Sequence, residues 1–223
     1  MGQLTRYSKG CTVTRITREI DFTSARGVEV ACNAILGPRS LVWFSLPCIG
    51  GCPWQSVNIR LGPDAERRIR GYLGLFAIMF RNALQLMAVA QDAGATIVIE
   101  WPRACRYWHY NRVRRALDRF GLSMYDFDGC MYGIKSILPK TRGTPIRKPW
   151  RIATNSPIIG QAFSQKCDGF HPAHAPCAGG DTRQTEGYSR RMADKFHRAF
   201  KLHCMNTNQH PSVAISARDA GSV

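Results

Sequence analysis

The feature of the sequence that most constrains the fold is a long helical repeat followed directly by a strand. Apolar residues recur at helical spacing from Asp64 to about Asp92, and Gly94 is a stop signal for that helix. The next segment, residues 95–100 (ATIVIE), is apolar and β-branched, which predicts a buried strand ending in the carboxylate of Glu100. A helix that leads into a buried strand in this way favours an α/β fold.

The rest of the chain continues this alternation. Further strands are expected at 41–46 (LVWFSL), within 122–134 and at 150–154 (WRIAT), and further amphipathic helices at 103–120 and 186–203. The pattern predicts a single α/β domain over residues 1–205, Rossmann-like, with a mainly parallel sheet flanked by helices. Residues 206–223 are small and polar, and they predict a disordered tail.

The charge of the chain restricts its partners. Lys and Arg number 31 against 15 Asp and Glu, which gives a formal net charge of +16. A polyanion commonly offsets self-repulsion of this size, so nucleic acid is the expected partner, DNA rather than RNA. A basic solvated surface with no specific partner is the alternative. The candidate contacts, taken from the most basic stretch, are Arg103, Arg106, Arg112, Arg115, Lys135, Arg142, Arg147 and Lys148.

The sequence also indicates a compartment. Its apolar runs are interrupted before they reach the ~20 residues that a bilayer span requires. Residues 1–10 lack the apolar stretch of a secretory signal. We therefore expect an intracellular, soluble protein with no membrane partner, and its oligomeric state is left open. Nine Cys in such a chain favour thiols, metal ligands or a nucleophile over disulfides.

Three polar side chains fall in or beside expected strand ends: Cys48, Glu100 and Arg151. Because chemistry collects at the C-terminal ends of parallel strands, these residues form a candidate catalytic site. The alternative is structural, with Cys48 as a small buried hydrophobe and Glu100 as a carboxylate paired with an arginine.

The residues around these strand ends resemble a known family. The segment 45–48 (SLPC) resembles the Pro-Cys motif of DNA cytosine-5 methyltransferases, and 100–102 (EWP) resembles their Glu-Asn-Val motif. Tyr132-Gly133 and the run 147–152 (RKPWRI) are similar to their Tyr-Gly and Arg-x-Arg elements. The resemblance covers roughly residues 40–155. The chain differs from the family in having Ile49 after the Cys, and in the lack of a glycine cluster before Cys48.

This resemblance implies a function and a division of roles. The Cys48 thiolate would add to C6 of a cytosine extruded from the helix. Glu100 would hydrogen-bond N3 of the base, and Arg151 would hold a base oxygen or a phosphate. The methyl donor would be S-adenosylmethionine. The chain would then be a divergent or degenerate methyltransferase-like core.

A second group of residues has metal-ligand chemistry. Cys167, His171, His174 and Cys177 form a C-x3-H-x2-H-x2-C pattern within one loop, inside a possible zinc loop at 167–180. Two thiolates and two imidazoles are enough for a closed tetrahedral zinc site. The alternative is a turn with surface histidines and buried cysteines.

Two further functions fit the sequence. Asp21, Glu100, Asp126 and Asp128 could hold Mg²⁺ in a nuclease. Alternatively, the chain is a non-enzymatic nucleic-acid-binding module, in which aromatic rings interleaved with the basic residues stack on single strands. The candidate rings are Trp101, Tyr107, Trp108, Tyr110 and Trp150. The runs 128–134, 148–154 and 167–171 also resemble modules of mobile-element polyproteins, which suits such a binding module.

Overall fold

The computed structural model describes residues 6–17, 19–171 and 173–207. The strands are β1 (Leu41–Phe44), β2 (Thr96–Pro102), β3 (Ser123–Asp128) and β4 (Pro149–Thr154). The helices are α1 (Ala25–Asn33), α2 (Gln55–Asn58), α3 (Pro63–Asp92), α4 (Asn111–Arg119), α5 (Pro157–Ala162), α6 (Gly180–Gln184) and α7 (Arg190–Thr207), and short 3-10 turns include η4 (Arg106–His109) and η5 (Gly129–Tyr132). The expected α/β class is confirmed. The expected tail begins inside α7, and residues 208–223 lie outside the described part.

The four strands form one open sheet in the order β1-β2-β4-β3. Strands β1 and β2 pair in parallel, whereas β4 is antiparallel to both β2 and β3. The prediction of a mainly parallel sheet was therefore wrong, and a Rossmann-like strand order is absent from the described residues. The physical reason lies in the β3–β4 connection, which contains η5 and a loop but no crossover helix, and a parallel pairing normally requires such a helix.

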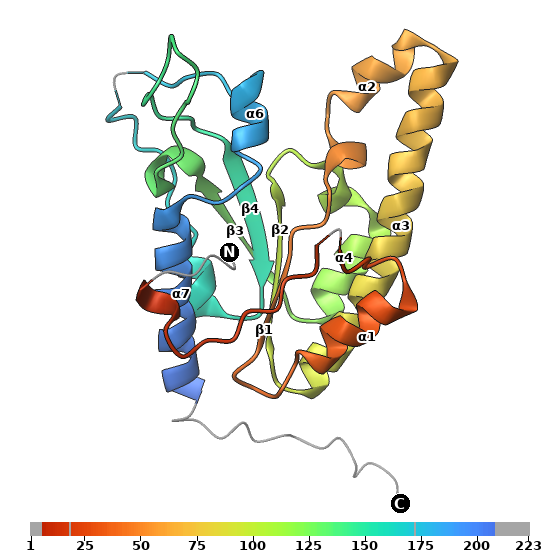
Figure 1. Cartoon of the computed structure of the whole chain (residues 1–223), viewed down its shortest axis with the longest axis vertical. Helices are drawn as coiled ribbons and strands as arrows, with labels where there is room; N and C mark the ends of the chain where they lie inside the picture. Colours follow the sequence, from red (N-terminus) through yellow and green to blue (C-terminus); the bar gives the residue numbers. More distant parts are fainter. Residues whose placement is uncertain (1–5, 18, 172, 208–223) are drawn as a thin grey trace, which may run out of the picture.

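Strand β4, which lies between β2 and β3, determines which strand ends lie together. Because β4 runs opposite to both neighbours, β1, β2 and β3 still share one direction. Their C-terminal ends therefore lie at one edge of the sheet, together with the start of β4 at Pro149. Side chains from the predicted strand ends meet or approach at this edge, which we call the upper edge after its position in Figure 1.

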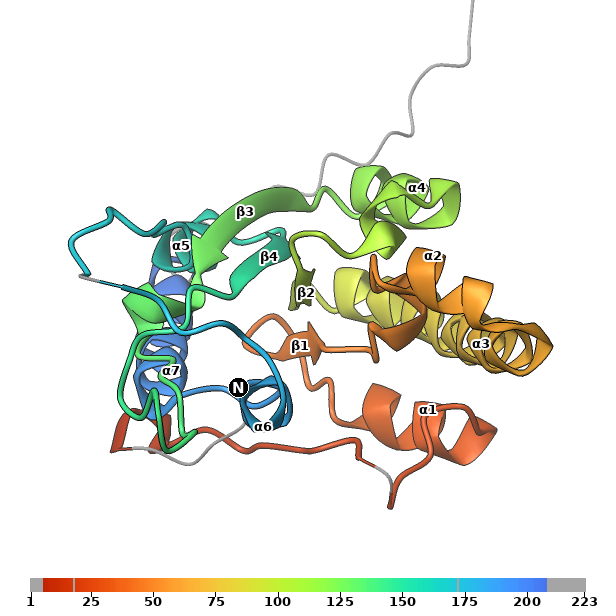
Figure 2. The ribbon, with the colours of Figure 1, turned by 90° about the horizontal axis from the view of Figure 1, so that it is seen from above.

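Helices cover both faces of the sheet (Figures 1 and 2). On the α3 side, Phe76, Phe80 and Met87 of α3 pack against Ile97 and Ile99 of β2. On the α7 side, buried side chains of α5 and α7 pack against Val98, Phe127 and Ile152. The alternation of β2 side chains between these two cores explains why all its residues before Pro102 are buried.

Helix α3 is long and apolar enough, by length and composition, to cross a membrane: it has 30 residues, and its most apolar window has a mean hydropathy of 1.6. In this fold one face of the helix packs against the sheet, whereas Leu75 and Ile78 are exposed. Phe76, Phe80, Ala83 and Met87 are almost completely buried in the α3-side core. This is how the central helix of a globular α/β domain packs against its sheet.

Candidate metal centre and nucleic-acid interface

Four potential metal ligands lie together beside the end of β3. They are Cys130, Cys167, His171 and His174, and one ligand atom from each lies within 4.8 Å of the others. The Cys167 Sγ is 3.4 Å from the His174 Nε2. A tetrahedral zinc site requires ligand–ligand separations of roughly 3.3–3.8 Å, from its bond lengths of about 2.0–2.3 Å. The group could therefore hold a metal ion after only small movements.

Segments far apart in the sequence build this group. The backbone NH of Asp128 donates to the Gln165 carbonyl at 3.1 Å, and the NH of Cys167 donates to the Asp128 Oδ2 at 2.9 Å. The NH of Gly129 in turn donates to the Arg147 carbonyl at 2.6 Å. The Gly129 NH is also 3.1 Å from the Lys148 carbonyl, so the segments 128–134, 148–154 and 167–171 meet beside the metal group.

One ligand atom of the group is available to bind a cation, and one ligand would first have to lose a proton. The Nε2 of His171 is buried and has no hydrogen-bond partner among the described residues, and an unpaired buried nitrogen is costly. Burial, together with a hydrogen bond with Cys167, raises the pKa of the Cys130 thiol to about 12. Metal binding would have to displace this proton, since only the thiolate is a ligand.

The structure brings together three of the four predicted ligands, Cys167, His171 and His174. Cys177 is exposed and lies outside the group, with its Sγ 3.3 Å from the Thr185 Oγ1. Cys130, a buried residue of η5, takes the fourth position. Spacing within one loop could not find Cys130, because it comes 37 residues before Cys167 and joins the loop only through tertiary hydrogen bonds.

At the upper edge of the sheet, the buried Glu100 accepts hydrogen bonds on the α7 side from partners that are themselves half-buried or exposed. The Tyr188 hydroxyl donates to its Oε2 at 2.6 Å, and the Ser45 hydroxyl donates to the same oxygen at 3.1 Å. The Trp43 Nε1 donates to the Tyr188 hydroxyl at 3.0 Å. Burial raises the pKa of Glu100, and these donors lower it by a smaller amount. Sequence reasoning missed two residues of this hydrogen-bond network. Tyr188 lies on the connection between α6 and α7, and Trp43 lies on β1.

The other two predicted catalytic residues differ from Glu100 in position. Cys48 packs against the α3-side core, and burial, the negative charge of Glu100 and nearby Cys52 together raise the pKa of its thiol. Arg151 pairs with Trp101 across the sheet and so lies on the α3 side, opposite to Glu100. There its guanidinium binds the Asp126 carboxylate with contacts of 2.6 and 3.0 Å. The structure thus separates Arg151 from Glu100.

The glycines after β1 do not form a cofactor cradle. A Cβ on Gly50 would lie 2.6 Å from the Tyr107 hydroxyl, and one on Gly51 would lie 2.7 Å from the Cys105 Sγ. Close packing against the loop after β2 therefore explains both glycines.

The predicted Mg²⁺ carboxylates are also not brought together. Asp21 accepts hydrogen bonds from Thr23 before α1, and these lower its pKa. Asp126 is bound to Arg151, while Asp128 contacts Arg147 at 3.3 Å and accepts from the Cys167 backbone. In the part of the chain that the structure describes, the Cys–His group is where three or more potential ligands converge.

The arginines of α4 form an exposed basic surface. Arg114 and Arg115 are exposed, and neither has a salt bridge to any described carboxylate. Arg112 is also exposed and lies over the rings of Phe76 and Tyr110 at 4.9 and 5.7 Å. Arg106, in η4 directly before α4, adds another exposed cation. We call Arg106, Arg112, Arg114, Arg115 and Arg119 the α4 basic surface.

The predicted cations outside α4 have different environments. Lys135 and Arg142 are exposed on the loop between η5 and β4, and Arg103 is half-buried after β2. Arg147 contacts Asp128. Lys148, however, points inward: its Nζ donates to the Thr185 carbonyl and lies 4.7 Å from the centre of the Trp150 ring. Because its ammonium group already donates inside the protein, Lys148 is a poorer phosphate contact than the exposed cations.

The aromatic rings predicted to stack on single strands are core residues. Trp101, Tyr107, Trp108 and Trp150 are all at least 97% buried, and Tyr110 is half-buried against Phe76 and Tyr107. The hypothesis that they form a stacking platform was therefore wrong. Of the described aromatics with large exposure, Trp54 is 71% exposed and Phe170 is 90% exposed.

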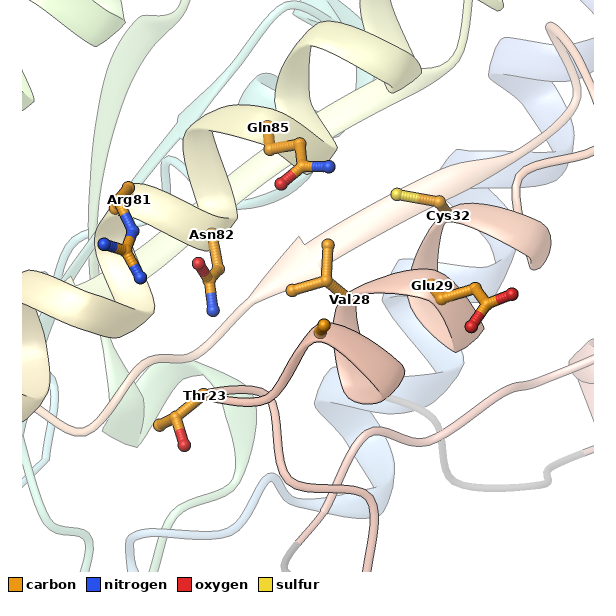
Figure 3. Close-up of a pocket in the computed structure, with 8 residues that line it drawn as sticks. Thr23, Val28, Glu29, Cys32, Arg81, Asn82 and Gln85 are labelled. Atoms are coloured by element: carbon orange, nitrogen blue, oxygen red, sulfur yellow. The ribbon is translucent and has the colours of Figure 1, made fainter.

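A cavity of about 470 Å³ lies elsewhere, between α1 and α3 (Figure 3). Val28, Glu29 and Cys32 line it from α1, and Asn82 and Gln85 line it from α3. The Asn82 amide donates to the Phe22 carbonyl at 2.8 Å, which ties the segment before α1 to α3. None of the predicted site residues lines this cavity.

Comparison with models of protein families, with curated proteins and with solved structures found no match.

Proposed function

We propose that this protein is a nucleic-acid-binding domain that also contains a structural zinc ion. The observation that supports binding most directly is the α4 basic surface, where several arginines are exposed without a described carboxylate partner. Exposed arginines without a carboxylate partner attract phosphates, and they repel one another as long as no polyanion is bound. DNA is the first substrate to test, because the resemblance to DNA methyltransferases favours DNA over RNA.

Zinc suits the ligand set. Cys130, Cys167, His171 and His174 provide two soft thiolates and two imidazoles, and a closed set of four protein ligands is typical of a structural site. The ion would hold the loop after α5 to the end of β3. The methyltransferase reaction that the resemblance implies stays a prediction, and the raised pKa of Cys48 and the position of Arg151 do not favour it.

The test is the salt dependence of binding to labelled DNA, measured by fluorescence anisotropy. We expect affinity to fall linearly with salt on a logarithmic scale. The R114Q/R115Q variant should bind severalfold more weakly, with a slope shallower by roughly 1.4–1.8, the contribution of two phosphate contacts. The matched control is R67Q/R70Q, which removes two α3 arginines already paired with Asp64 and Glu66.

The control separates local contacts from net charge. If both double variants lost affinity equally, total charge rather than the α4 basic surface would determine binding. Wild-type protein that does not bind DNA or RNA at about 50 mM salt would contradict the proposed function.

A further inference from the structure

Phe170 is a phenylalanine with almost no protein contact, at a position of defined geometry. Its side chain is 90% exposed. The Asp168 side chain accepts from the Phe170 NH at 3.1 Å, and Gly169 adopts a φ of 83°, which a glycine tolerates best. The turn 168–170 therefore presents the ring outward from between two ligands of the metal group, Cys167 and His171. A bound ion would fix both ends of this turn.

The surface beside this turn is basic. Lys166 directly precedes the metal ligand Cys167. The pKa of Asp126 is lowered, chiefly by its hydrogen bonds with Arg151 and further by the positive charges of Arg151, Arg103 and Lys166. Three cations thus surround one carboxylate and leave a positive excess. Asp126 lies on β3 and Arg151 on β4, whereas Arg103 follows β2 and Lys166 belongs to the loop after α5. Figure 2 shows β3 between that loop and α4.

A second basic segment reaches the same loop from the other direction. The NH of Ala175 donates to the Pro145 carbonyl at 2.9 Å, which joins the metal loop to the loop that carries the exposed Lys135 and Arg142. Phe170 therefore projects from a loop that itself carries the exposed Lys166 and that is joined to the loop of Lys135 and Arg142. An apolar protein partner would have to bury these charges, whereas an unpaired nucleotide offers a flat base for the ring and phosphates for the cations.

We propose that Phe170 is an aromatic anchor on which an unpaired base of single-stranded nucleic acid stacks. The bases of a duplex are stacked within the helix, and Phe170 cannot reach their faces, so the anchor confers a preference for single strands. This inference rests on the proposed function and adds the strand type that the site recognises. The anchor is distinct from the α4 basic surface, which contacts phosphates of either strand type.

The experiment measures binding of zinc-loaded protein to three fluorescein-labelled probes: (dT)15, (U)15 and a 15-base-pair DNA duplex. We expect F170A to weaken binding to the single strands about tenfold, the contribution of one stacked base, and to change duplex affinity less than twofold. F170W should restore the single-strand affinity. The control is W54A, which removes the other exposed ring from the distant α2 region (Figure 1) and should leave all three affinities unchanged.

The outcomes separate this inference from the proposed function. Wild-type protein that binds no probe contradicts both. Wild-type binding together with unchanged single-strand affinity in F170A overturns the anchor and leaves nucleic-acid binding in place. Equal losses of single-strand and duplex affinity in F170A also overturn it, because they would indicate damage to the loop rather than lost stacking. The (dT)15 and (U)15 arms show which sugar the site accepts.

Discussion

Glu100 is a carboxyl group that the folded protein keeps largely away from water. It is only 7% exposed, and burial raises its pKa, so folding favours its protonated form. A carboxyl group with a raised folded pKa contributes stability that is fully present below its unfolded pKa and is lost as pH rises through the folded value. The wild-type protein therefore loses stability through this residue as the pH rises above about 4.5.

The variant E100Q tests this at the level of one residue. Glutamine stays neutral and still offers an oxygen to the Tyr188 hydroxyl, so the free energy of unfolding of E100Q should increase relative to wild type as pH rises. The slope of this difference should be at most about 1.4 kcal/mol per pH unit. Urea unfolding at pH 4, 6 and 8 measures it. A difference that is constant across pH would mean that Glu100 ionises normally. Y188F should extend the pH dependence to higher pH, because it removes a donor that favours the charged form of Glu100 and so raises the pKa of Glu100 further.

At the scale of elements, the metal loop makes the sharpest prediction, because sequence and structure disagree on one ligand. C130S should lose the bound zinc, whereas C177S should retain about one zinc per chain, as measured by mass spectrometry of the native protein. Loss of the ion should also lower the melting temperature by roughly 5–10 °C, which is what about 2.7 kcal/mol of binding linkage gives in a domain of this size. Zinc retained in C130S and lost in C177S would show that the loop alone supplies the ligands.

The same disagreement shows what local patterns can predict. The strands at 41–46, 95–100 and 150–154 were placed within a few residues of β1, β2 and β4, since buried strands have strong apolar patterns. The direction of β4 was not predicted, although the missing helix between Ile134 and Pro149 is a signal for antiparallel pairing. Cys130 and Tyr188 could not be found, because each reaches its site only through contacts distant in the sequence.

At the scale of the whole molecule, the net charge of +16 has a consequence for stability. The described salt bridges include the exposed pairs Arg67–Asp64 and Arg70–Glu66, which contribute little. Arg112, Arg114, Arg115 and Arg119 of the α4 basic surface lie on α4 itself, where successive members are at most four residues, or about 6 Å of helix rise, apart. This rise is shorter than the Debye length of about 10 Å at 0.1 M salt. The repulsion between these arginines destabilises the folded state when salt is low.

Raising sodium chloride from about 20 mM to about 200 mM should therefore raise the melting temperature of the free protein. A gain of about 1 kcal/mol corresponds to roughly 2–4 °C in a domain of this size. In R114Q/R115Q this rise in melting temperature should be smaller, because two of the repelling charges are gone. The control R67Q/R70Q removes arginines that are paired with Asp64 and Glu66, so its rise should not be reduced in this way. A melting temperature that falls with added salt would mean that attractive pairs outweigh the repulsion. The unpaired arginines would then no longer support the binding of a polyanion. Thermal unfolding by circular dichroism of all three proteins, without nucleic acid, measures this directly.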